Sequence, residues 1–86
     1  MTDEQKQKTR ERIGIRIMLL RKQAGLTQEE LAERAGLQRT HVGRIEAGKY
    51  AVTLETIQAI AEALEMTVDI VDPALANLAP MKRLMP

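Results

Sequence analysis

Hydrophobic residues in the first part of the chain recur with the period of a helix. Ile13, Ile17, Leu20 and Ala24 follow one another at steps of four, three and four residues. At about 100° per residue these positions fall within a stripe about 60° wide. The spacing predicts a first helix whose stripe faces the core. Gly25 follows directly and is typical of the residue that ends a helix.

A second, shorter helix is predicted by its capping residues. Thr27 and Glu30 have the spacing of a capping box, in which each side chain satisfies a backbone amide of the other residue. The helix is therefore expected to begin at Gln28 and to end at Gly36. Its apolar positions are Leu31, Ala32 and Ala35.

Two further helices follow from the next apolar patterns. The next apolar pattern begins with Leu37 and continues with Val42 and Ile45, and the third helix is predicted from Arg39 to Ala47, directly before Gly48. Thr53 is a typical N-cap for a fourth helix. The apolar face of that fourth helix is formed by Leu54, Ile57, Ile60, Ala61 and Leu64.

The pattern changes after Glu65. Apolar and polar residues alternate from Met66 to Val71, and β-branched side chains are enriched there, which predicts a short strand. A lone strand leaves its backbone groups unpaired, so we expect it to pair with its own copy across a two-fold axis. Asp72 and Pro73 are expected to begin a last helical turn.

Composition narrows the classes of function. The chain has no Cys, which excludes disulfides, thiolate metal sites and Cys nucleophiles and suits a reducing cytoplasm. A single His without an obvious partner favours neither a metal site nor catalysis, so we expect no enzyme, no metal and no cofactor. The longest apolar run, Ile17 to Leu20, is far shorter than the roughly 20 residues of a membrane span. We therefore expect a cytoplasmic chain without membrane contact.

The charges are distributed unevenly although the net charge is only +1. Residues 1–24 contain seven Lys or Arg and three Asp or Glu, whereas residues 51–79 contain five acidic residues and no basic one. One side of the protein can thus face phosphate while another faces a partner. Tyr50 is the one aromatic residue, so recognition of RNA or single strands by stacking lacks its chemistry. Duplex DNA remains as the nucleic-acid partner.

The spacing of small residues in the second and third helices points to a known motif. Counted from Gln28, Ala32 falls fifth, Gly36 ninth and Val42 fifteenth. Two helices that cross near a right angle need a small residue at the crossing and a glycine at the turn. The pattern resembles the helix-turn-helix of the phage lambda repressor and Cro family, of the Xre type. The resemblance also covers Ile13-Gly14, Arg21-Lys22, Gly25-Leu26-Thr27-Gln28, Leu31-Ala32 and the run from Arg44 to Lys49.

This resemblance implies a mainly α bundle of four or five helices, with the third helix in the major groove. It also implies a homodimer that acts as a repressor on a near-palindromic operator in the nucleoid. The expected parts are a flexible basic N-terminal arm at residues 1–8, a helix-turn-helix DNA-binding domain at 9–65, a strand and turn for dimerisation at 66–79, and a flexible tail at 80–86.

The residues expected to contact DNA lie on and around the third helix. A helical wheel places Val42 and Ile45 inward, and the opposite face is expected to read base edges. The base-reading residues are Arg39, Thr40, Gly43 and Arg44. The candidates for phosphate contacts are Thr27, Gln28, His41, Lys49 and Tyr50. For His41, packing and phosphate contact remain equal alternatives. We interpret Gly43 as clearance for DNA, because glycine costs about 1 kcal/mol relative to alanine inside a helix.

Three further sets of residues have other expected roles. The resemblance implies that Arg21 and Glu46 form a structural ion pair between the first and third helices. The first helix has a second apolar face, formed by Ile15, Met18 and Leu19, which either the chain's own C-terminal segment or a partner protein would cover. Val68 and Ile70 are the candidate dimer contacts of the strand.

Two alternatives to a repressor remain open from the sequence. The alternating segment after the fourth helix is similar to that of persister-type antitoxins, so an antitoxin that binds a protein toxin and represses its own operon is one alternative. A protein adaptor that uses the same bundle without DNA is the other.

Overall fold

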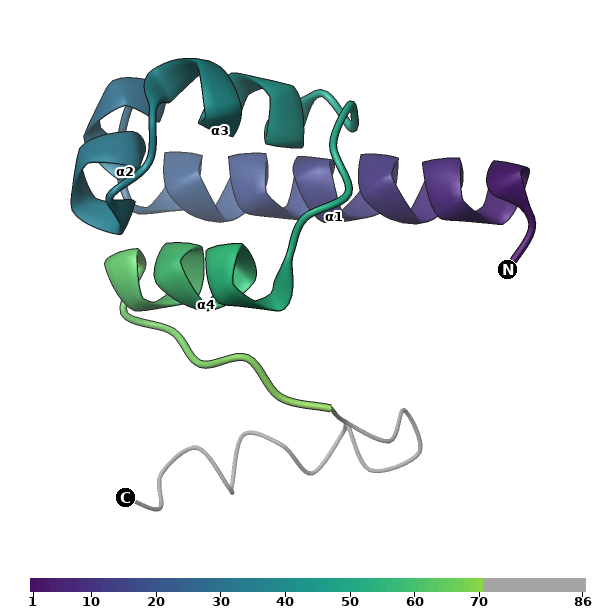
Figure 1. The fold of residues 1–86 in the computed structure, drawn as a ribbon. Coiled ribbons are helices and arrows are strands. Elements are labelled where there is room, and N and C mark those ends of the chain that lie inside the picture. The colour runs from purple at the N-terminus through teal and green to yellow at the C-terminus, as the bar shows by residue number, and fades with distance from the viewer. Residues whose placement is uncertain (71–86) are drawn as a thin grey trace.

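The computed structural model describes residues 1–70, which contain four helices. They are α1 (Asp3–Gln23), α2 (Gln28–Ala35), α3 (Arg39–Glu46) and α4 (Leu54–Ala63). In the view of Figure 1, α3 lies above the long helix α1 and α4 lies below it, with α2 at their left-hand end. Helix α2 packs against α3 and α4, and α3 packs against α1. The four predicted helices are confirmed. No helix in this part of the chain is long and apolar enough to cross a membrane.

The polar caps begin the helices where the sequence predicts. The Thr27 hydroxyl accepts from the Glu30 amide over 3.0 Å, and the Glu30 carboxylate accepts from the Thr27 amide over 2.9 Å. The Thr53 hydroxyl likewise accepts from the Thr56 amide at the start of α4. Gly36 adopts a φ of 70°, which lets the chain turn from α2 directly towards α3.

The core lies where α1, α2, α3 and α4 meet. Three side chains in it are fully buried: Leu31, Val42 and Ile45. Ile17, Ala32 and Ile60 complete the buried cluster. Leu54 differs from the expectation for the α4 face, because 70% of it is exposed. Leu54 is the first residue of α4. The helical period predicts the direction in which its side chain points, but it does not predict whether another element packs against the end of the helix.

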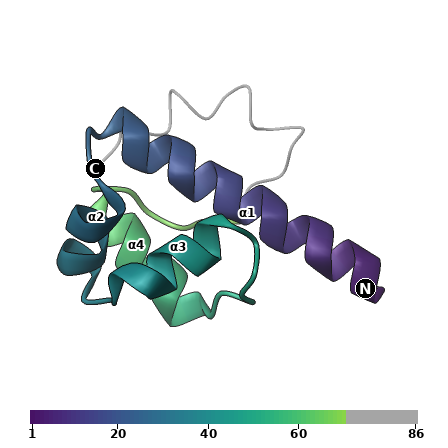
Figure 2. The same ribbon diagram turned by 90° about the horizontal axis from the view of Figure 1, so that it is seen from above.

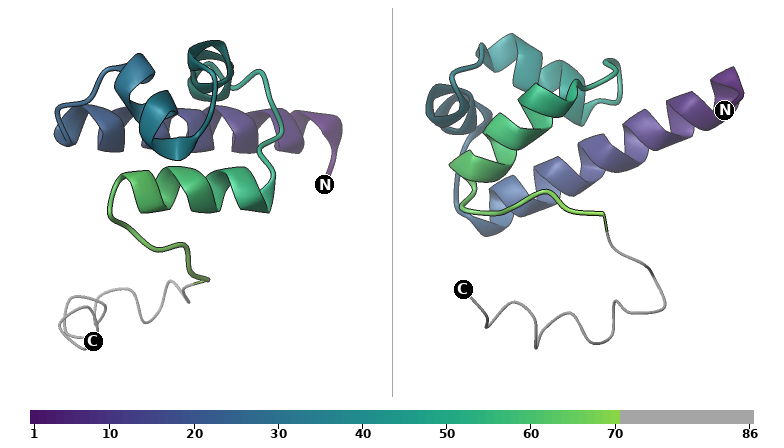
Figure 3. Two further views of the ribbon diagram at one scale, coloured as in Figure 1. Left: turned by 60° about the vertical axis from the view of Figure 1, so that its left-hand side comes forward. Right: turned by 60° about the horizontal axis from the view of Figure 1, so that its bottom comes forward.

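The prediction of a flexible arm at residues 1–8 is wrong from Asp3 onwards, because α1 begins there. Thr2 and Gln5 form a capping box, with hydrogen bonds of 3.1 Å and 2.7 Å between side chain and backbone. Farther along, the Gln7 side-chain amide donates to the Gly48 carbonyl over 3.1 Å. Figure 2 and Figure 3 show these N-terminal turns extending beyond the other three helices. The arm is therefore a capped helix that is fastened to the loop after α3.

The expected strand at residues 66–71 does not form within the described chain. Glu65 has a φ of 58°, the Met66 amide donates to the Ala61 carbonyl over 2.7 Å, and residues 66–70 then continue without regular structure. A strand needs a neighbour, and no second extended segment lies beside this one in residues 1–70. Pairing with a second copy stays a prediction. Residue 71, the helical turn after Pro73 and the tail at 80–86 lie outside the described residues.

Candidate nucleic-acid interface

Helix α3 has one buried face and one exposed face. Val42 and Ile45 are fully buried against the bundle. Arg39, Thr40 and Arg44 are exposed, and Gly43 between them is half-buried. The structure thus brings the four residues expected to read bases onto the part of α3 that the bundle does not cover. Figure 3 shows α3 at the outside of the molecule, next to α2.

The residues around Gly43 leave room for a side chain there. A Cβ placed on Gly43 would lie 3.6 Å from the amide oxygen of Gln28 and 4.0 Å from its amide nitrogen, which is ordinary contact. The fold therefore accommodates more than a glycine at this position. Packing within the described chain therefore does not explain why this position is a glycine.

A buried ion pair connects α1 with the end of α3. Arg21 Nε lies 2.7 Å from Glu46 Oε2, and Nη2 donates to Oε1 over 3.0 Å. Arg21 Nη1 donates to the Leu26 carbonyl over 2.8 Å. The hydrogen bond to Glu46 raises the pKa of Arg21, although burial acts in the opposite direction. Because breaking one side of a buried pair costs about 3–5 kcal/mol, this contact fixes the position of α3 relative to α1.

Gln28 joins this buried network from α2. Its Nε2 donates to Glu46 Oε1 over 3.0 Å, so Glu46 accepts from both Arg21 and Gln28. Gln28 is half-buried, and Thr27 before it is exposed. The capping box uses the Thr27 amide and leaves the backbone amides of Gln28 and Glu29, in the first turn of α2, without an intramolecular partner in the described chain.

Tyr50 contacts two other candidate DNA-binding residues, Arg44 and His41. Arg44 Nη1 donates to Tyr50 Oη over 3.1 Å, and the guanidinium carbon lies 5.7 Å from the centre of the tyrosine ring. His41 stacks on the same ring, with centroids 5.2 Å apart and an interplanar angle of 2°. His41 and Arg44 are three residues apart on α3, and Gly48 allows the chain to fold back; those two signals could have indicated the contact. Lys49 is exposed in the same loop.

Glycine also allows the helices to approach closely at the C-terminal end of α3. A Cβ on Gly14 would overlap the Ile45 carbonyl and lie 2.7 Å from the Glu46 carbonyl oxygen. Gly48 has a φ of 73°, and a Cβ there would lie 2.9 Å from Glu11 Cγ. Both contacts join α1 to the end of α3. The close approach of these two helices therefore depends on Gly14 and Gly48, which have no side chain.

Two surfaces of the described chain carry groups of apolar residues outside the core. Ile15 and Leu19 of α1 are 51% and 45% exposed, and Met18 is half-buried. Residues 66–69, α1 and α4 together line a groove of about 500 Å³. The residues that α1 contributes to this groove are Ile13, Arg16, Ile17 and Leu20. The described C-terminal segment thus lies beside a different face of α1 from the one that carries Ile15 and Leu19.

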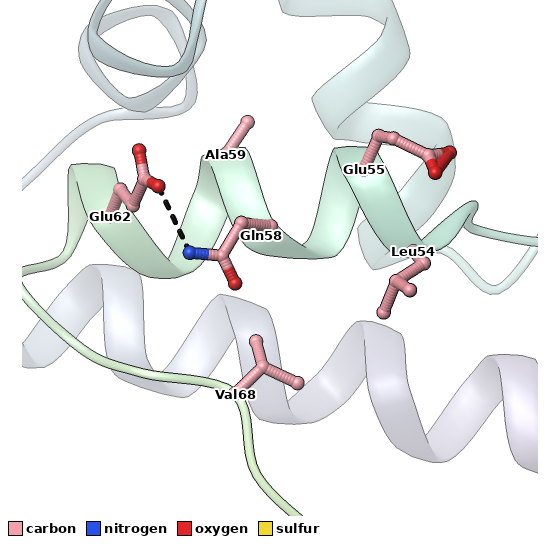
Figure 4. Close-up of a pocket in the computed structure, with 6 residues that line it drawn as sticks. All are labelled: Leu54, Glu55, Gln58, Ala59, Glu62 and Val68. Carbon is pink, nitrogen blue, oxygen red and sulfur yellow. Dashed lines mark hydrogen bonds between the residues drawn. The ribbon is translucent and has the colours of Figure 1, made fainter.

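The second surface is the outer side of α4. A shallow groove of about 540 Å³ runs along it, and Val68 forms its far wall (Figure 4). Val68 is 43% exposed and Ile70 is 98% exposed. The other lining residues are Leu54, Glu55, Gln58, Ala59 and Glu62. Gln58 faces Val68 across the groove, and its side-chain amide donates to the carboxylate of Glu62 over 2.9 Å (Figure 4).

Comparison with known proteins gives curated relatives among regulators. The immunity repressor protein of Bacillus phage phi105 is 43% identical over 56 residues, which are 65% of this chain and 39% of the repressor. Control protein C.SmaI of Serratia marcescens is 46% identical over 43 residues, or 50% of this chain and 51% of that protein. The uncharacterised HTH-type transcriptional regulator y4dJ of Sinorhizobium fredii is 34% identical over 65 residues, 74% of this chain and 84% of that regulator. The chain thus spans well under half of the phage repressor.

Two solved structures have the same arrangement of helices. The restriction-modification controller protein C.AhdI from Aeromonas hydrophila superposes with a TM-score of 0.64 and 41% identity, covering 65% of this chain and 85% of that protein. The controller protein C.Esp1396I superposes with a TM-score of 0.63 and 25% identity, covering 87% and 92%. The model of the helix-turn-helix family matches residues 17–71. The chain therefore belongs to the helix-turn-helix family of the lambda-repressor type.

Proposed function

We propose that this protein is a sequence-specific DNA-binding transcriptional regulator that represses as a dimer. The observation that carries the proposal is the exposed face of α3, where Arg39, Thr40 and Arg44 lie together on a helix whose other face is buried. The relatives support it, since they are named as an immunity repressor, transcriptional regulators and controller proteins. Such a protein acts as a binding module rather than an enzyme, in the cytoplasm at the nucleoid.

The chemistry of the exposed face suits the major groove. A guanidinium group can donate two parallel hydrogen bonds to O6 and N7 of guanine, so Arg39 and Arg44 are the proposed guanine readers. Thr40 offers a hydroxyl group to a base edge and a methyl group to thymine. The half-buried Gly43 lets the backbone of α3 approach the bases. Each good bidentate contact discriminates against the wrong base by about 1–3 kcal/mol.

Phosphate contacts are proposed on both sides of α3. The free backbone amides in the first turn of α2, together with Thr27 and Gln28, form one candidate site for a phosphate oxygen. Lys49 is exposed in the loop after α3 and forms the other. His41 and Tyr50 remain candidates because they lie beside Arg44 in the same region. Such contacts position the protein on DNA and carry no sequence information themselves.

The first experiment compares variants of the two classes. Arg39→Ala and Arg44→Ala are each expected to lower affinity for a duplex selected by the wild-type protein by about 1–3 kcal/mol, with little effect on random DNA. Lys49→Ala is the matched control, expected to weaken binding to all sequences alike and to lower the salt slope by about one unit. Equal losses on selected and random duplexes for the arginine variants would refute their role as base readers.

The proposed dimer is supported by apolar side chains that the rest of residues 1–70 leaves exposed. Leu54 and Val68 line the groove on α4 and are 70% and 43% exposed (Figure 4), and Ile70, two residues after Val68, is 98% exposed. Burying a side chain such as Val68 or Ile70 fully contributes about 1.5–3 kcal/mol, and a two-fold dimer buries each of them twice. The dimer would present two copies of α3 about 34–36 Å apart, or about one turn of DNA, so footprints should show two half-sites at that spacing.

Sedimentation at low micromolar concentration tests the dimer. Val68→Pro removes a backbone donor from the proposed shared strand and should shift the protein towards monomer while the four helices still melt cooperatively. Ile15→Glu is the control for the other apolar surface and should leave the dimer unchanged. If the proline variant stays dimeric and the glutamate variant dissociates, the dimer forms through α1 and the shared strand is wrong.

Neither alternative function receives a specific observation in its favour. The names of the relatives give no toxin partner, and the exposed Ile15 and Leu19 do not by themselves identify a protein that would cover them. A protein adaptor would not need the exposed arginines of α3 to read bases. The DNA-binding regulator is therefore the function that we carry forward.

A further inference from the structure

Arg44 is exposed on α3, yet its side chain is held by a neighbour from outside the helix. The hydrogen bond from Nη1 to Tyr50 Oη and the position of the guanidinium near the tyrosine ring restrict the conformations of a side chain with four rotatable bonds. Arginine otherwise loses much rotamer entropy when it binds. Arg39 is the contrast, because it forms no side-chain hydrogen bond with any residue of the range 1–70 and is free to reorient.

Tyr50 itself is held from two sides. Its ring stacks in parallel on His41, one turn of α3 before Arg44. Its backbone follows Gly48, whose carbonyl accepts from Gln7 of α1 and whose φ of 73° turns the chain back towards α3. The phenol group is therefore placed by α1 through the loop and by α3 through the stacked ring. A side chain that is fixed in this way can orient another.

We propose that Tyr50 is a positioning residue that orients Arg44 towards one base pair of the operator. The inference rests on the proposed function and assigns to the tyrosine hydroxyl a role in specificity, beyond a phosphate contact. The phenol oxygen uses one guanidinium N–H and leaves the other four donors available, which is enough for a bidentate contact with guanine. Orienting the guanidinium before binding lowers the entropy that has to be lost on the DNA.

A double-mutant cycle tests the coupling between the two residues. Tyr50→Phe removes the hydroxyl and keeps the ring and its stack on His41. On the duplex that the wild-type protein selects from a random library, this variant should bind about threefold to tenfold more weakly, the worth of one hydrogen bond. In an Arg44→Ala background the same change should alter affinity by less than about twofold, because the group that Tyr50 orients is gone.

Arg39→Ala provides the matched control background. Arg39 lies on the same exposed face, so Tyr50→Phe should retain its full effect there. Repeated selection gives a second readout: Tyr50→Phe and Arg44→Ala should weaken the preference at the same base pair. A purely structural role for Tyr50 would weaken binding at every position equally.

The outcomes separate this inference from the proposed function. Additive losses in the Arg44→Ala background, together with equal weakening on random DNA, would identify Tyr50 as a phosphate contact and overturn the positioning role. An unchanged affinity for Tyr50→Phe would overturn it as well. If the wild-type protein selects no preferred duplex at all, the proposed function itself fails, which the selection shows before any variant is made.

Discussion

Substitution of Gly43 by alanine should raise stability and impair DNA binding at the same time. Glycine inside a helix is about 0.8–1.0 kcal/mol less favourable than alanine. The added methyl group would meet only the Gln28 side chain at 3.6 Å and 4.0 Å, so no clash offsets this gain. We expect Gly43→Ala to stabilise the fold by about 1 kcal/mol, which raises Tm by roughly 4–8 °C for a domain of this size.

Binding should change in the opposite direction. If Gly43 gives the backbone of α3 room to approach the bases, the methyl group occupies that room, and affinity for the selected duplex should fall about tenfold, the equivalent of 1.4 kcal/mol. Thermal melting and a binding isotherm on one preparation check both parts. A variant that is more stable and binds as well as the wild-type protein would refute the clearance that we assign to Gly43. A Gly43→Ala variant that is less stable than the wild-type protein would refute the conclusion that the space beside Gly43 accommodates a methyl group.

Three further predictions concern residues that hold the helices around the site in place. Gly14→Ala should destabilise the fold strongly and release α3 from α1, because its Cβ would overlap the Ile45 carbonyl; urea unfolding measures the loss. Glu46→Gln should cost about 3 kcal/mol in urea unfolding by leaving Arg21 buried without a counter-charge, and an unchanged midpoint would contradict this. Hydrogen bonds with Thr27 lower the pKa of Glu30 in the folded protein. The ionised Glu30 therefore contributes stability above the pKa that it has in the unfolded chain, and this contribution is lost as the pH falls through its folded pKa. In Glu30→Gln, unfolding midpoints should therefore fall less between neutral and acid pH than in the wild-type protein.

The helices could be predicted from the sequence because local chemistry determines where they begin and end. Thr27 and Thr53 cap α2 and α4 through their own hydroxyl groups, within three residues of each helix start. Gly36 supplies the left-handed conformation that the turn requires. These interactions involve neighbours in the sequence, so a pattern of a few residues contains most of the information.

The N-terminal residues show how a local signal can be overlooked. Residues 1–8 are rich in polar and charged side chains and have no apolar stripe, which favours disorder. Thr2 and Gln5 nevertheless have the spacing of a capping box, the same signal that locates α2. The long-range contact between Gln7 and Gly48 has no counterpart in any local pattern. The capping box could have been read from the sequence, whereas the contact with the loop could not.

In the candidate site, too, local features could be predicted from the sequence and long-range contacts could not. The periodicity of α3 separates its buried residues from its exposed arginines, so the exposed face of this helix could be predicted. The contact of Arg44 with Tyr50 depends on the conformation of the loop between them, which is determined by Gly48 and by its packing against α1. Gly48 indicates in the sequence that the chain can turn back here, but it does not identify Tyr50 as the residue that Arg44 contacts. Contacts that cross from a loop to a helix are therefore what a structure adds.

The N-terminal turns of α1 connect to the reading face through that same loop. The family match begins at residue 17, whereas α1 begins at Asp3, so these turns precede the part of the chain that the family model matches. Yet Gln7 and Glu11 contact Gly48, two residues before Tyr50. The buried ion pair of Arg21 and the close approach at Gly14 position the end of α3 itself. The long first helix thus positions both α3 and the loop that carries Tyr50, which is a physical reason for its length.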